Sequence, residues 1–352
     1  MCDFSQYDGA SDEWHAVAAT LPAAPTGLSI LERRGATNAV REATAAAAYK
    51  KLAPWLNTLD HSIPTRDGST IEARTYRLAG LVDSEPLPVH IHLHGGGFFF
   101  GSIASEDAIC ARIAFNTSFI VLNVNYRHTP EHTYPTAWND VEDAFSWVHE
   151  NAAALNADPA RVVVGGISAG ASLAASLVLR QHLDLVATDR PKIAGQVLMI
   201  PTTVHIKCNG PQLAKMKDLK LSSWETCKDA PILSRETCEF FTGLLTPDST
   251  PNDDDLRINP GNVSADQVKG LPPTVVGVAG NDPLRDEGLL YAKMLAESGV
   301  PTDVHVFKGV PHGFRRFGDE LSESKRWDLV AERGIVWALS EPEAGAFEIK
   351  TQ

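Results

Sequence analysis

The amino-acid sequence predicts an α/β protein with a doubly wound, mostly parallel sheet and helices on both faces. Short apolar and β-branched runs, which are typical of buried strands, alternate along most of the chain with longer segments of helical periodicity. The chain has 352 residues, 43% of them hydrophobic, so it is long enough to bury a large core. We therefore expect one catalytic unit that carries an insertion.

The expected strands begin at residue 70, after the turn signal Asp67-Gly68. Strands are expected at residues 70–77, 89–94, 118–124, 162–164, 195–200, 274–279 and 303–307, and helices at 135–154, 168–180, 286–298 and 321–339. Residues 1–60 show no strand pattern, and the Ala-rich stretch 37–59 favours helix. The long detour from Pro201 to Pro273 is typical of an inserted helical subdomain.

Composition excludes several classes of protein. A net charge of -13 argues against nucleic acid or an anionic membrane surface as a partner, because both recruit Lys and Arg. The five cysteines show no C-x-x-C spacing and leave one unpaired in any disulfide scheme, which favours a reducing compartment. The first residues do not resemble a secretory signal, and no apolar run is long enough for a membrane span. We therefore expect a cytoplasmic protein.

The motif Gly166-x-Ser168-x-Gly170 lies between an expected strand and an expected helix. In such an elbow the chain reverses so sharply that the serine stands at the tip of the turn, and only glycines leave room for the neighbouring backbone. A glycine-rich turn without chemistry would have the same pattern. The flanking strand and helix favour Ser168 as a nucleophile.

A second glycine-rich segment, His94-Gly95-Gly96-Gly97-Phe98, directly follows an expected strand. Consecutive glycines let backbone N–H groups converge on one point, as a developing oxyanion requires. We expect the N–H groups of Gly96, Gly97 and Ala169 to form this oxyanion hole. A phosphate-binding loop is disfavoured because no G-K-[ST] follows.

The general base and its acid are expected at the ends of later strands. Asp282 follows the strand at 274–279, at the sheet edge where open α/β sheets place their active sites. His312 follows the last expected strand. Asp286 is the alternative acid, although its charge also suits the start of a helix. The order Ser168, Asp282, His312 is that of α/β-hydrolases.

Three alternating histidines, His90, His92 and His94, suggest a metal site as an alternative. At about 3.3 Å per residue the outer two are about 13 Å apart, whereas zinc holds its ligands at about 2 Å. All three therefore cannot bind one ion, and we expect no metal. We interpret His90 and His92 as polar residues of the sheet or core and His94 as a brace for the glycine-rich segment.

Together these motifs resemble the hormone-sensitive-lipase group of α/β-hydrolases, which includes bacterial, plant and fungal carboxylesterases. The resemblance covers about residues 88–320 and is carried by His94-Gly-Gly-Gly97-Phe98, Tyr126-Arg127-His128-Thr129-Pro130-Glu131-His132, Gly166-Ile-Ser168-Ala-Gly170, Asp282-Pro-Leu-Arg-Asp-Glu287 and His312-Gly313-Phe314. Ile167 stands where many members have Asp, and Ala171 where a third glycine is common. Both differences should alter packing at the elbow more than the chemistry.

The resemblance implies an eight-stranded sheet and hydrolysis of carboxylic esters, without a cofactor, through an acyl-serine. The substrates expected are esters with small to medium acyl groups, or lactones. The resemblance also implies a cap, which fits N-terminal helices at 1–60 and an insertion at 203–260, over a catalytic core formed by residues 61–202 and 261–352. Some members of the group form dimers, so a homodimer is a possible assembly of this chain.

Aromatic residues near these motifs are candidates for an apolar substrate pocket, with ordinary core packing as the alternative. The candidates are Phe98, Trp224, Phe240 and Phe314.

Two other functions are alternatives to ester hydrolysis. A ligand receptor of this fold is disfavoured because the triad is intact. An acyltransferase, cyclase or dehydratase would use the same residues and stays open. Epoxide hydrolases and haloalkane dehalogenases need a carboxylate where this chain has Ser168.

Overall fold

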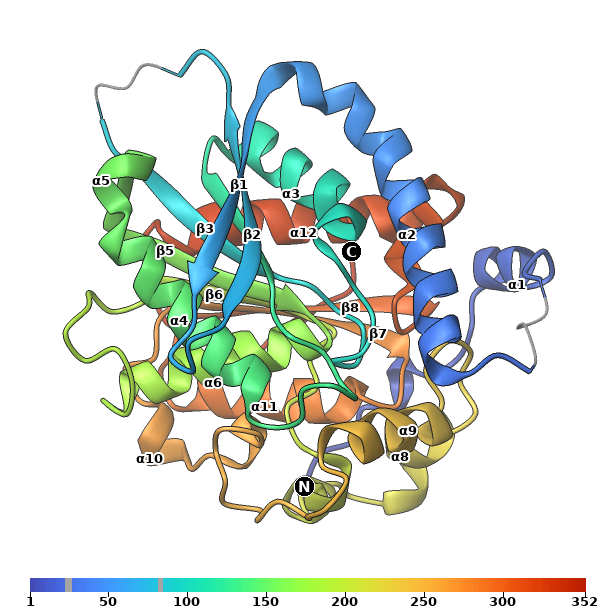
Figure 1. The fold of residues 1–352 in the computed structure, drawn as a ribbon. Helices are drawn as coiled ribbons and strands as arrows, with labels where there is room; N and C mark the ends of the chain where they lie inside the picture. The colour runs from blue at the N-terminus through green and yellow to red at the C-terminus, as the bar shows by residue number, and fades with distance from the viewer. Residues whose placement is uncertain (23–26, 82–84) are drawn as a thin grey trace.

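The computed structural model describes residues 1–22, 27–81 and 85–352. Nine strands of these residues form one twisted sheet in the order β1-β2-β4-β3-β5-β6-β7-β8-β9 (Figure 1). Only β1 with β2 and β2 with β4 pair antiparallel, and every other pair is parallel. The strands are β1 (Leu56–Pro64), β2 (Thr70–Leu78), β3 (Leu87–Leu93), β4 (Ile120–Asn125), β5 (Ala157–Ile167), β6 (Gly195–Met199), β7 (Thr274–Asn281), β8 (Thr302–Pro311) and β9 (Ile349–Lys350).

Helices cover both faces of the sheet, as the sequence predicts (Figure 1). One face packs against α4 (Thr136–Glu150), α6 (Ala169–His182) and α11 (Arg285–Glu297). The other packs against α1 (Asp12–Ala18), α3 (Ile103–Thr117) and α12 (Ser322–Ala338). The remaining α-helices are α2 (Ile30–Leu52), α5 (Ala152–Leu155), α7 (Gly210–Leu213), α8 (Ser223–Thr226), α9 (Arg235–Leu245) and α10 (Ala265–Val268).

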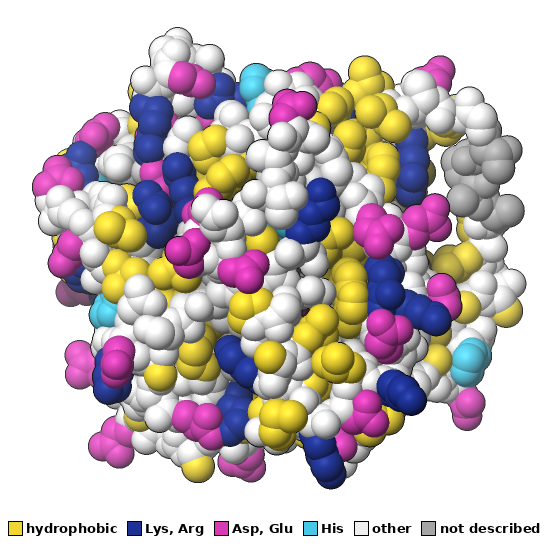
Figure 2. Space-filling model, turned by 90° about the horizontal axis from the view of Figure 1, so that it is seen from below, with side chains coloured by type: hydrophobic (Ala, Val, Ile, Leu, Met, Phe, Trp, Pro, Cys, Tyr) yellow, Lys and Arg dark blue, Asp and Glu magenta, His cyan; other side chains and the backbone are white. Residues whose placement is uncertain are grey.

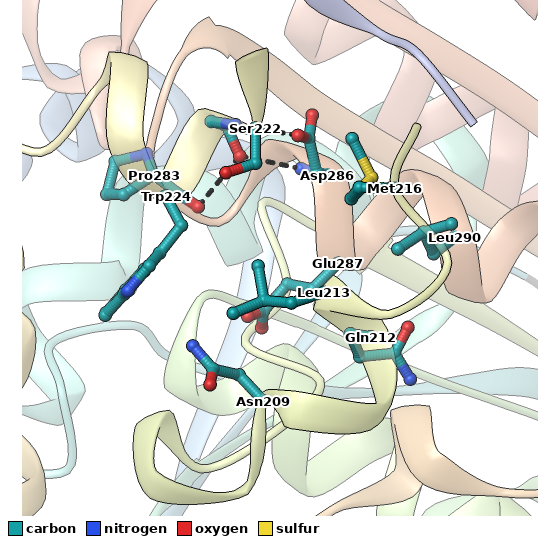
Figure 3. A pocket seen from close by; sticks show the side chains of 11 residues that line it. Asn209, Gln212, Leu213, Met216, Ser222, Trp224, Pro283, Asp286, Glu287 and Leu290 are labelled. Carbon is teal, nitrogen blue, oxygen red and sulfur yellow. Dashed lines mark hydrogen bonds between the residues drawn. The ribbon is translucent and has the colours of Figure 1, made fainter. Parts of the chain in front are cut away.

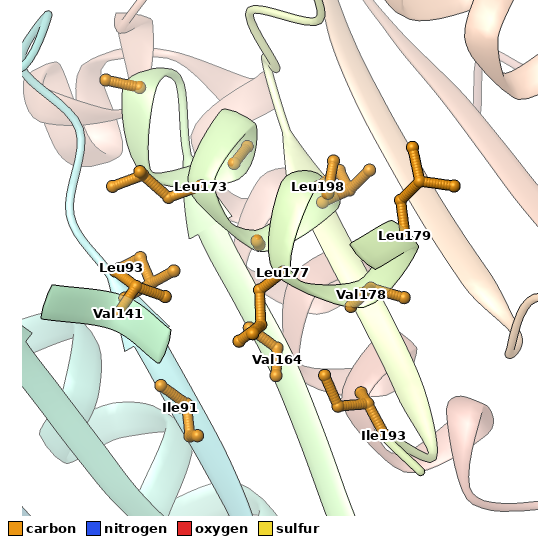
Figure 4. Close-up of a cluster of buried hydrophobic side chains, with 14 of the residues drawn as sticks. Ile91, Leu93, Val141, Val164, Leu173, Leu177, Val178, Leu179, Ile193 and Leu198 are labelled. Carbon is orange, nitrogen blue, oxygen red and sulfur yellow. The ribbon is translucent and has the colours of Figure 1, made fainter. Parts of the chain in front are cut away.

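Alternation along the central strands divides the core into two layers. Ile91 and Leu93 of β3 face the layer under α6, together with Val164 of β5 (Figure 4). His90 and Val163, one residue away in each strand, belong to the opposite side, where His90 borders a small cavity beside α3 and α12. Because both faces are covered, β5 is apolar or small on both sides from Val162 to Ile167, which is the pattern of a buried parallel strand, whereas β3 carries His90 and His92 on one side.

Three features differ from the sequence prediction. β1 begins at Leu56, inside the region expected to be helical, and α2 already ends at Leu52. Most of β1 is exposed, so it lacks a hydrophobic strand pattern. Helix α3 was not expected, because buried polar residues such as Glu106 and Asp107 interrupt its apolar face. The sheet has nine strands where eight were implied, and the added pairing on β8 is the two-residue β9.

The residues expected to form an insertion contain short helices, of which α9 is the longest. Figure 1 shows α9 near the lower end of α2, and Arg33 of α2 lies over the ring of Phe240 of α9. The division into cap and core stays a prediction. The face shown in Figure 2 carries acidic and basic side chains that are interspersed. No helix formed by the described residues is long and apolar enough to cross a bilayer.

Candidate active site

Ser168 stands at the turn between β5 and α6, with backbone angles of φ 56° and ψ −116°. Residues other than glycine rarely adopt such backbone angles, and these angles mark the strained turn that the sequence predicts. The flanking glycines are sterically required. A Cβ on Gly166 would lie 2.4 Å from the carbonyl carbon of Gly170, and a Cβ on Gly170 would lie 2.0 Å from the carbonyl oxygen of Leu93.

The three residues expected to form a triad lie together. His312 Nε2 is 2.9 Å from Ser168 Oγ, and His312 Nδ1 is 2.7 Å from Asp282 Oδ2. Asp282 follows β7 and His312 follows β8, so adjacent parallel strands deliver both side chains to the same edge of the sheet. With its proton on Nδ1, the imidazole can accept the hydroxyl proton of Ser168.

Asp286, the alternative acid, lies elsewhere. It lies in the first turn of α11 and accepts the N–H of Ser223 at 2.7 Å and the Nε–H of Arg285 at 2.8 Å. Its carboxylate thereby ties α8 to α11. Asp282 also accepts the N–H of Leu284 at 2.9 Å through Oδ1, which fixes the orientation of the carboxylate that contacts His312.

The glycine-rich segment adopts a conformation that requires glycine. Gly96 has φ 140° and Gly97 has φ 63°, both in the region that L side chains rarely adopt. Throughout the described chain, no residue accepts a hydrogen bond from the N–H of Gly96, Gly97 or Ala169. Three free backbone donors next to the Ser168 turn are what an oxyanion hole needs. We call residues 95–101 the oxyanion loop.

His94 lies beneath this loop and is fully buried. Its ring stacks on Tyr126 with 4.3 Å between ring centroids, and the Tyr126 hydroxyl donates to the His94 carbonyl at 2.7 Å. Burial lowers the pKa of His94 to about 4, so its imidazole is neutral at pH 7. Its Nδ1 is 3.2 Å from the Gly95 carbonyl oxygen, and a Cβ on Gly101 would lie 2.3 Å from the ring. These contacts support the role of a brace that the sequence suggests.

The two histidines of β3, His90 and His92, have different surroundings. His92 Nε2 is 3.0 Å from Glu106 Oε2. His90 is 2% exposed, and its burial lowers its pKa to about 3. Among the described residues no group of three or more His, Cys, Asp or Glu side chains is arranged to hold a metal ion.

The four predicted substrate-binding residues lie in different surroundings. Phe98 stacks on Trp138 at 5.0 Å, and the buried Phe314 packs edge-on against Trp327, so both have the surroundings of core residues. Trp224 borders a small cavity that Pro283 and Glu287 also line (Figure 3). Phe240 contacts Phe99 edge-on at 5.7 Å.

Phe241 is the aromatic residue of α9 that follows Phe240. A Cβ on Gly97 would lie 2.4 Å from its ring, so α9 covers the oxyanion loop directly. The sequence holds adjacent phenylalanines at 240 and 241, but only the helix position shows which of them lies over Gly97.

The sequence analysis gives Glu287 no role of its own, although this residue ends the Asp282 motif. Its Oε1 accepts the N–H of Thr203 at 2.7 Å and the N–H of Val204 at 3.4 Å, which ties α11 to the segment after β6. Figure 3 shows the side chain in the cavity that Asn209 and Gln212 also line. Burial raises the pKa of Glu287 to about 8.

We expect Glu287→Gln to remove a pH dependence of stability. A carboxyl whose pKa is raised from 4.5 to about 8 binds its proton more tightly in the folded chain. The free energy of unfolding therefore falls as pH rises from about 5 to about 8, on the order of 3 kcal/mol, whereas the amide of the variant would not titrate. Urea unfolding at pH 5, 6.5 and 8 measures this. Parallel pH curves for wild type and variant would contradict it.

With this geometry established, the chain can be compared with known proteins. A family model described as the alpha/beta hydrolase fold matches residues 90–316. The chain therefore belongs to the α/β-hydrolase family. The relatives and structures below place it in the hormone-sensitive-lipase-like carboxylesterase group, which confirms the resemblance found in the sequence.

Two relatives and two solved structures illustrate the likeness. Carboxylesterase NlhH of Mycobacterium tuberculosis is 35% identical over 261 residues, covering 70% of this chain and 76% of that protein. Versiconal hemiacetal acetate esterase of Dothistroma septosporum is 32% identical, covering 84% and 85%. The structure of vibralactone cyclase has a TM-score of 0.84 at 28% identity, covering 97% and 98%. A bacterial heroin esterase has a TM-score of 0.78 at 28% identity, covering 96% and 100%.

Proposed function

We propose that the protein is a carboxylic ester hydrolase in which Ser168 forms an acyl-enzyme. The observation that carries this proposal is the hydrogen-bonded chain from Ser168 Oγ through His312 to Asp282, which is buried at the strand ends. The esterase names of relatives that cover most of the chain support the same reaction.

In the first half of the reaction, Ser168 Oγ attacks the ester carbonyl carbon while His312 Nε2 takes the hydroxyl proton. The carbonyl oxygen becomes an oxyanion, which accepts hydrogen bonds from the N–H groups of Gly96, Gly97 and Ala169. The Asp282 carboxylate stabilises the imidazolium through Nδ1. His312 then protonates the leaving alkoxide, and the alcohol departs.

In the second half, water attacks the acyl carbon and gives its proton to His312 Nε2. The same N–H groups stabilise the second oxyanion. Collapse returns the proton to Ser168 Oγ and releases the carboxylic acid. Apart from the ester and water, each step uses side chains and backbone groups of this chain.

The substrates we propose are small esters, and residues 1–60 and 203–260 are proposed to form the cap over them. Phe241 lies over Gly97, and its ring contacts Phe100 edge-on at 5.9 Å. Phe99 and Phe240 extend this aromatic cluster. Space beside the oxyanion loop is therefore limited by rings from two segments, which favours short acyl groups.

We expect p-nitrophenyl acetate and butanoate to be hydrolysed with a higher kcat/KM than the octanoate and longer esters. Phe241→Ala should shift the optimum toward longer chains, because it removes the ring over Gly97. The measurement is release of p-nitrophenol across the ester series, with and without EDTA. Phe347→Ala, in an aromatic residue that packs against Lys293 away from the loop, is the control and should keep the wild-type optimum.

Other outcomes of the same series would contradict the proposal. A stoichiometric burst without turnover would indicate an acyltransferase or cyclase that awaits its own acceptor. Loss of activity in EDTA would contradict a mechanism that uses protein groups alone. Absence of both burst and turnover would favour a receptor.

We further propose a cytoplasmic location. All five cysteines lie in the described residues and are unpaired, and four of them are buried. Free thiols persist in a reducing compartment, so this state supports the location that the cysteine spacing predicts.

A further inference from the structure

Helix α2 presents an unusual face to the rest of the molecule. Arg34, Asn38 and Arg41 follow one another at intervals of four and three residues, and Glu42 lies four residues after Asn38. Each makes a hydrogen bond to a residue outside the helix. The large apolar residues Leu31 and Val40 are 49% and 68% exposed. The single buried residue of α2 is Ala45. Over its first three turns the helix is therefore held mainly by polar contacts.

Two of these polar contacts, from Asn38 and Arg41, reach the two ends of the oxyanion loop. At its last residue, Asn38 Nδ2 donates to the Gly101 carbonyl at 3.1 Å, and the Gly101 N–H donates to Asn38 Oδ1 at 3.0 Å. At its first residue, Arg41 Nη2 donates to the Gly95 carbonyl at 3.2 Å. Gly96 and Gly97 lie between these two fixed points.

The side chain of Arg41 is itself anchored from below. Its Nη2 donates to Glu106 Oε1 at 3.0 Å, and Glu106 Oε2 is 3.0 Å from His92 Nε2. Burial opposes the charge of Glu106, but the hydrogen bond to His92 and the charge of Arg41 lower its pKa to about 2. A buried carboxylate that stays charged at neutral pH holds the guanidinium in place.

A glycine-rich loop needs such support if it is to act in catalysis. Glycine has the widest backbone freedom, so Gly96 and Gly97 do not fix their own N–H directions. Oxyanion donors are effective only when their positions are set before the reaction, and a displacement of about 1 Å can cost about a hundredfold in rate. Thr129 bonds the Phe98 carbonyl at 2.8 Å in the middle of the loop, and His94 packs against it from below. The side chains of α2 add a contact at each end of the loop.

We propose that Asn38 and Arg41 are positioning residues, which hold the oxyanion loop in the geometry that stabilises the transition state. This inference rests on the proposed ester hydrolysis. It assigns to α2 a role in the chemical step, in addition to covering the site.

The test compares four variants with wild type in two measurements. One is the hydrolysis of p-nitrophenyl acetate, and the other is inhibition by a trifluoromethyl ketone. Asn38→Ala and Arg41→Ala remove the two contacts, and Arg41→Lys keeps a cation at one of them. Tyr49→Phe is the control, because Tyr49 lies on the same face of α2 and its hydroxyl bonds Thr58 at 2.9 Å, away from the loop. The ketone carbon accepts Ser168 Oγ, the hydroxyl proton passes to His312, and the resulting oxyanion occupies the hole.

We expect Asn38→Ala and Arg41→Ala each to lower kcat by about ten- to a hundredfold, with KM within about threefold of wild type. The inhibition constant of the ketone should rise by the same factor as kcat falls. Arg41→Lys should recover part of the loss, and Tyr49→Phe should match wild type. Melting temperatures check that each variant folds, and Asn38→Ala carries the test if Arg41→Ala does not fold.

The proposal is overturned if both alanine variants keep kcat near the wild-type value, or if Tyr49→Phe loses as much as they do. A parallel rise in KM and in the inhibition constant would also overturn it, since the contacts would then serve binding in general. A wild type that neither turns over the ester nor binds the ketone would refute ester hydrolysis itself and the positioning role with it.

Discussion

Ser168→Ala is expected to lower kcat for ester hydrolysis by about 10⁶-fold, because alanine has no oxygen to form the acyl-enzyme. The oxyanion donors and the binding surface remain, so KM should change little. Steady-state release of p-nitrophenol gives the rate, and labelling by a fluorophosphonate reports the nucleophile separately. The variant should melt near the wild-type temperature, since among the described residues the Ser168 side chain is bonded only to His312.

Ser176→Ala is a matched control for this change. Ser176 is also fully buried on α6, and its hydroxyl has no partner among the described residues. The same substitution on the same helix should therefore keep the wild-type rate and labelling. A Ser168→Ala variant with unchanged turnover would refute the acyl-serine mechanism.

Asp282→Asn is expected to lower kcat by about 10⁴-fold. An asparagine amide can donate to His312 Nδ1, which would leave the ring proton on Nε2. The imidazole then donates toward Ser168 Oγ and cannot accept its proton. The fold should persist, because the substitution keeps the shape of the side chain and the oxygen that accepts the Leu284 N–H. Initial rates at pH 7 and thermal melting measure the two effects separately.

Asp286→Asn distinguishes the two aspartates of the motif. Asp286 pairs with Arg285 and bonds Ser223, so this variant should lose stability while its folded fraction keeps its kcat. If Asp286→Asn instead lost the rate and Asp282→Asn did not, the assignment of the acid would be reversed.

The catalytic core was predictable because its residues follow local rules. The end of β5 is buried on both faces, so residues 162–164 appear as a continuous apolar run. The glycines at 166 and 170 are required because a Cβ on either would lie within 2.5 Å of neighbouring backbone atoms. The order of Ser168, Asp282 and His312 then follows from the succession of strands. Three motifs far apart in the chain were enough to indicate one site.

The contacts that surround the site were not predictable, because they depend on how distant segments meet. Nothing near Asn38 in the sequence indicates that it bonds Gly101, and the adjacent residues Phe240 and Phe241 are chemically identical. Helix α3 was missed for a related reason, since its buried Glu106 is stabilised by Arg41 and His92 from other elements. Periodicity cannot detect a polar residue whose partner lies elsewhere.

Strands β1 and β9 were both missed, and both lie at the ends of the strand order. An edge strand exposes backbone N–H and C=O groups that can pair with another chain, and natural proteins limit this with short, charged or proline-bearing edges. β9 is only two residues long, while β1 carries Asp60, which is bound to Arg74, and ends at Pro64. The same lack of apolar pattern that conceals these strands from sequence analysis therefore protects the sheet against edge-to-edge aggregation.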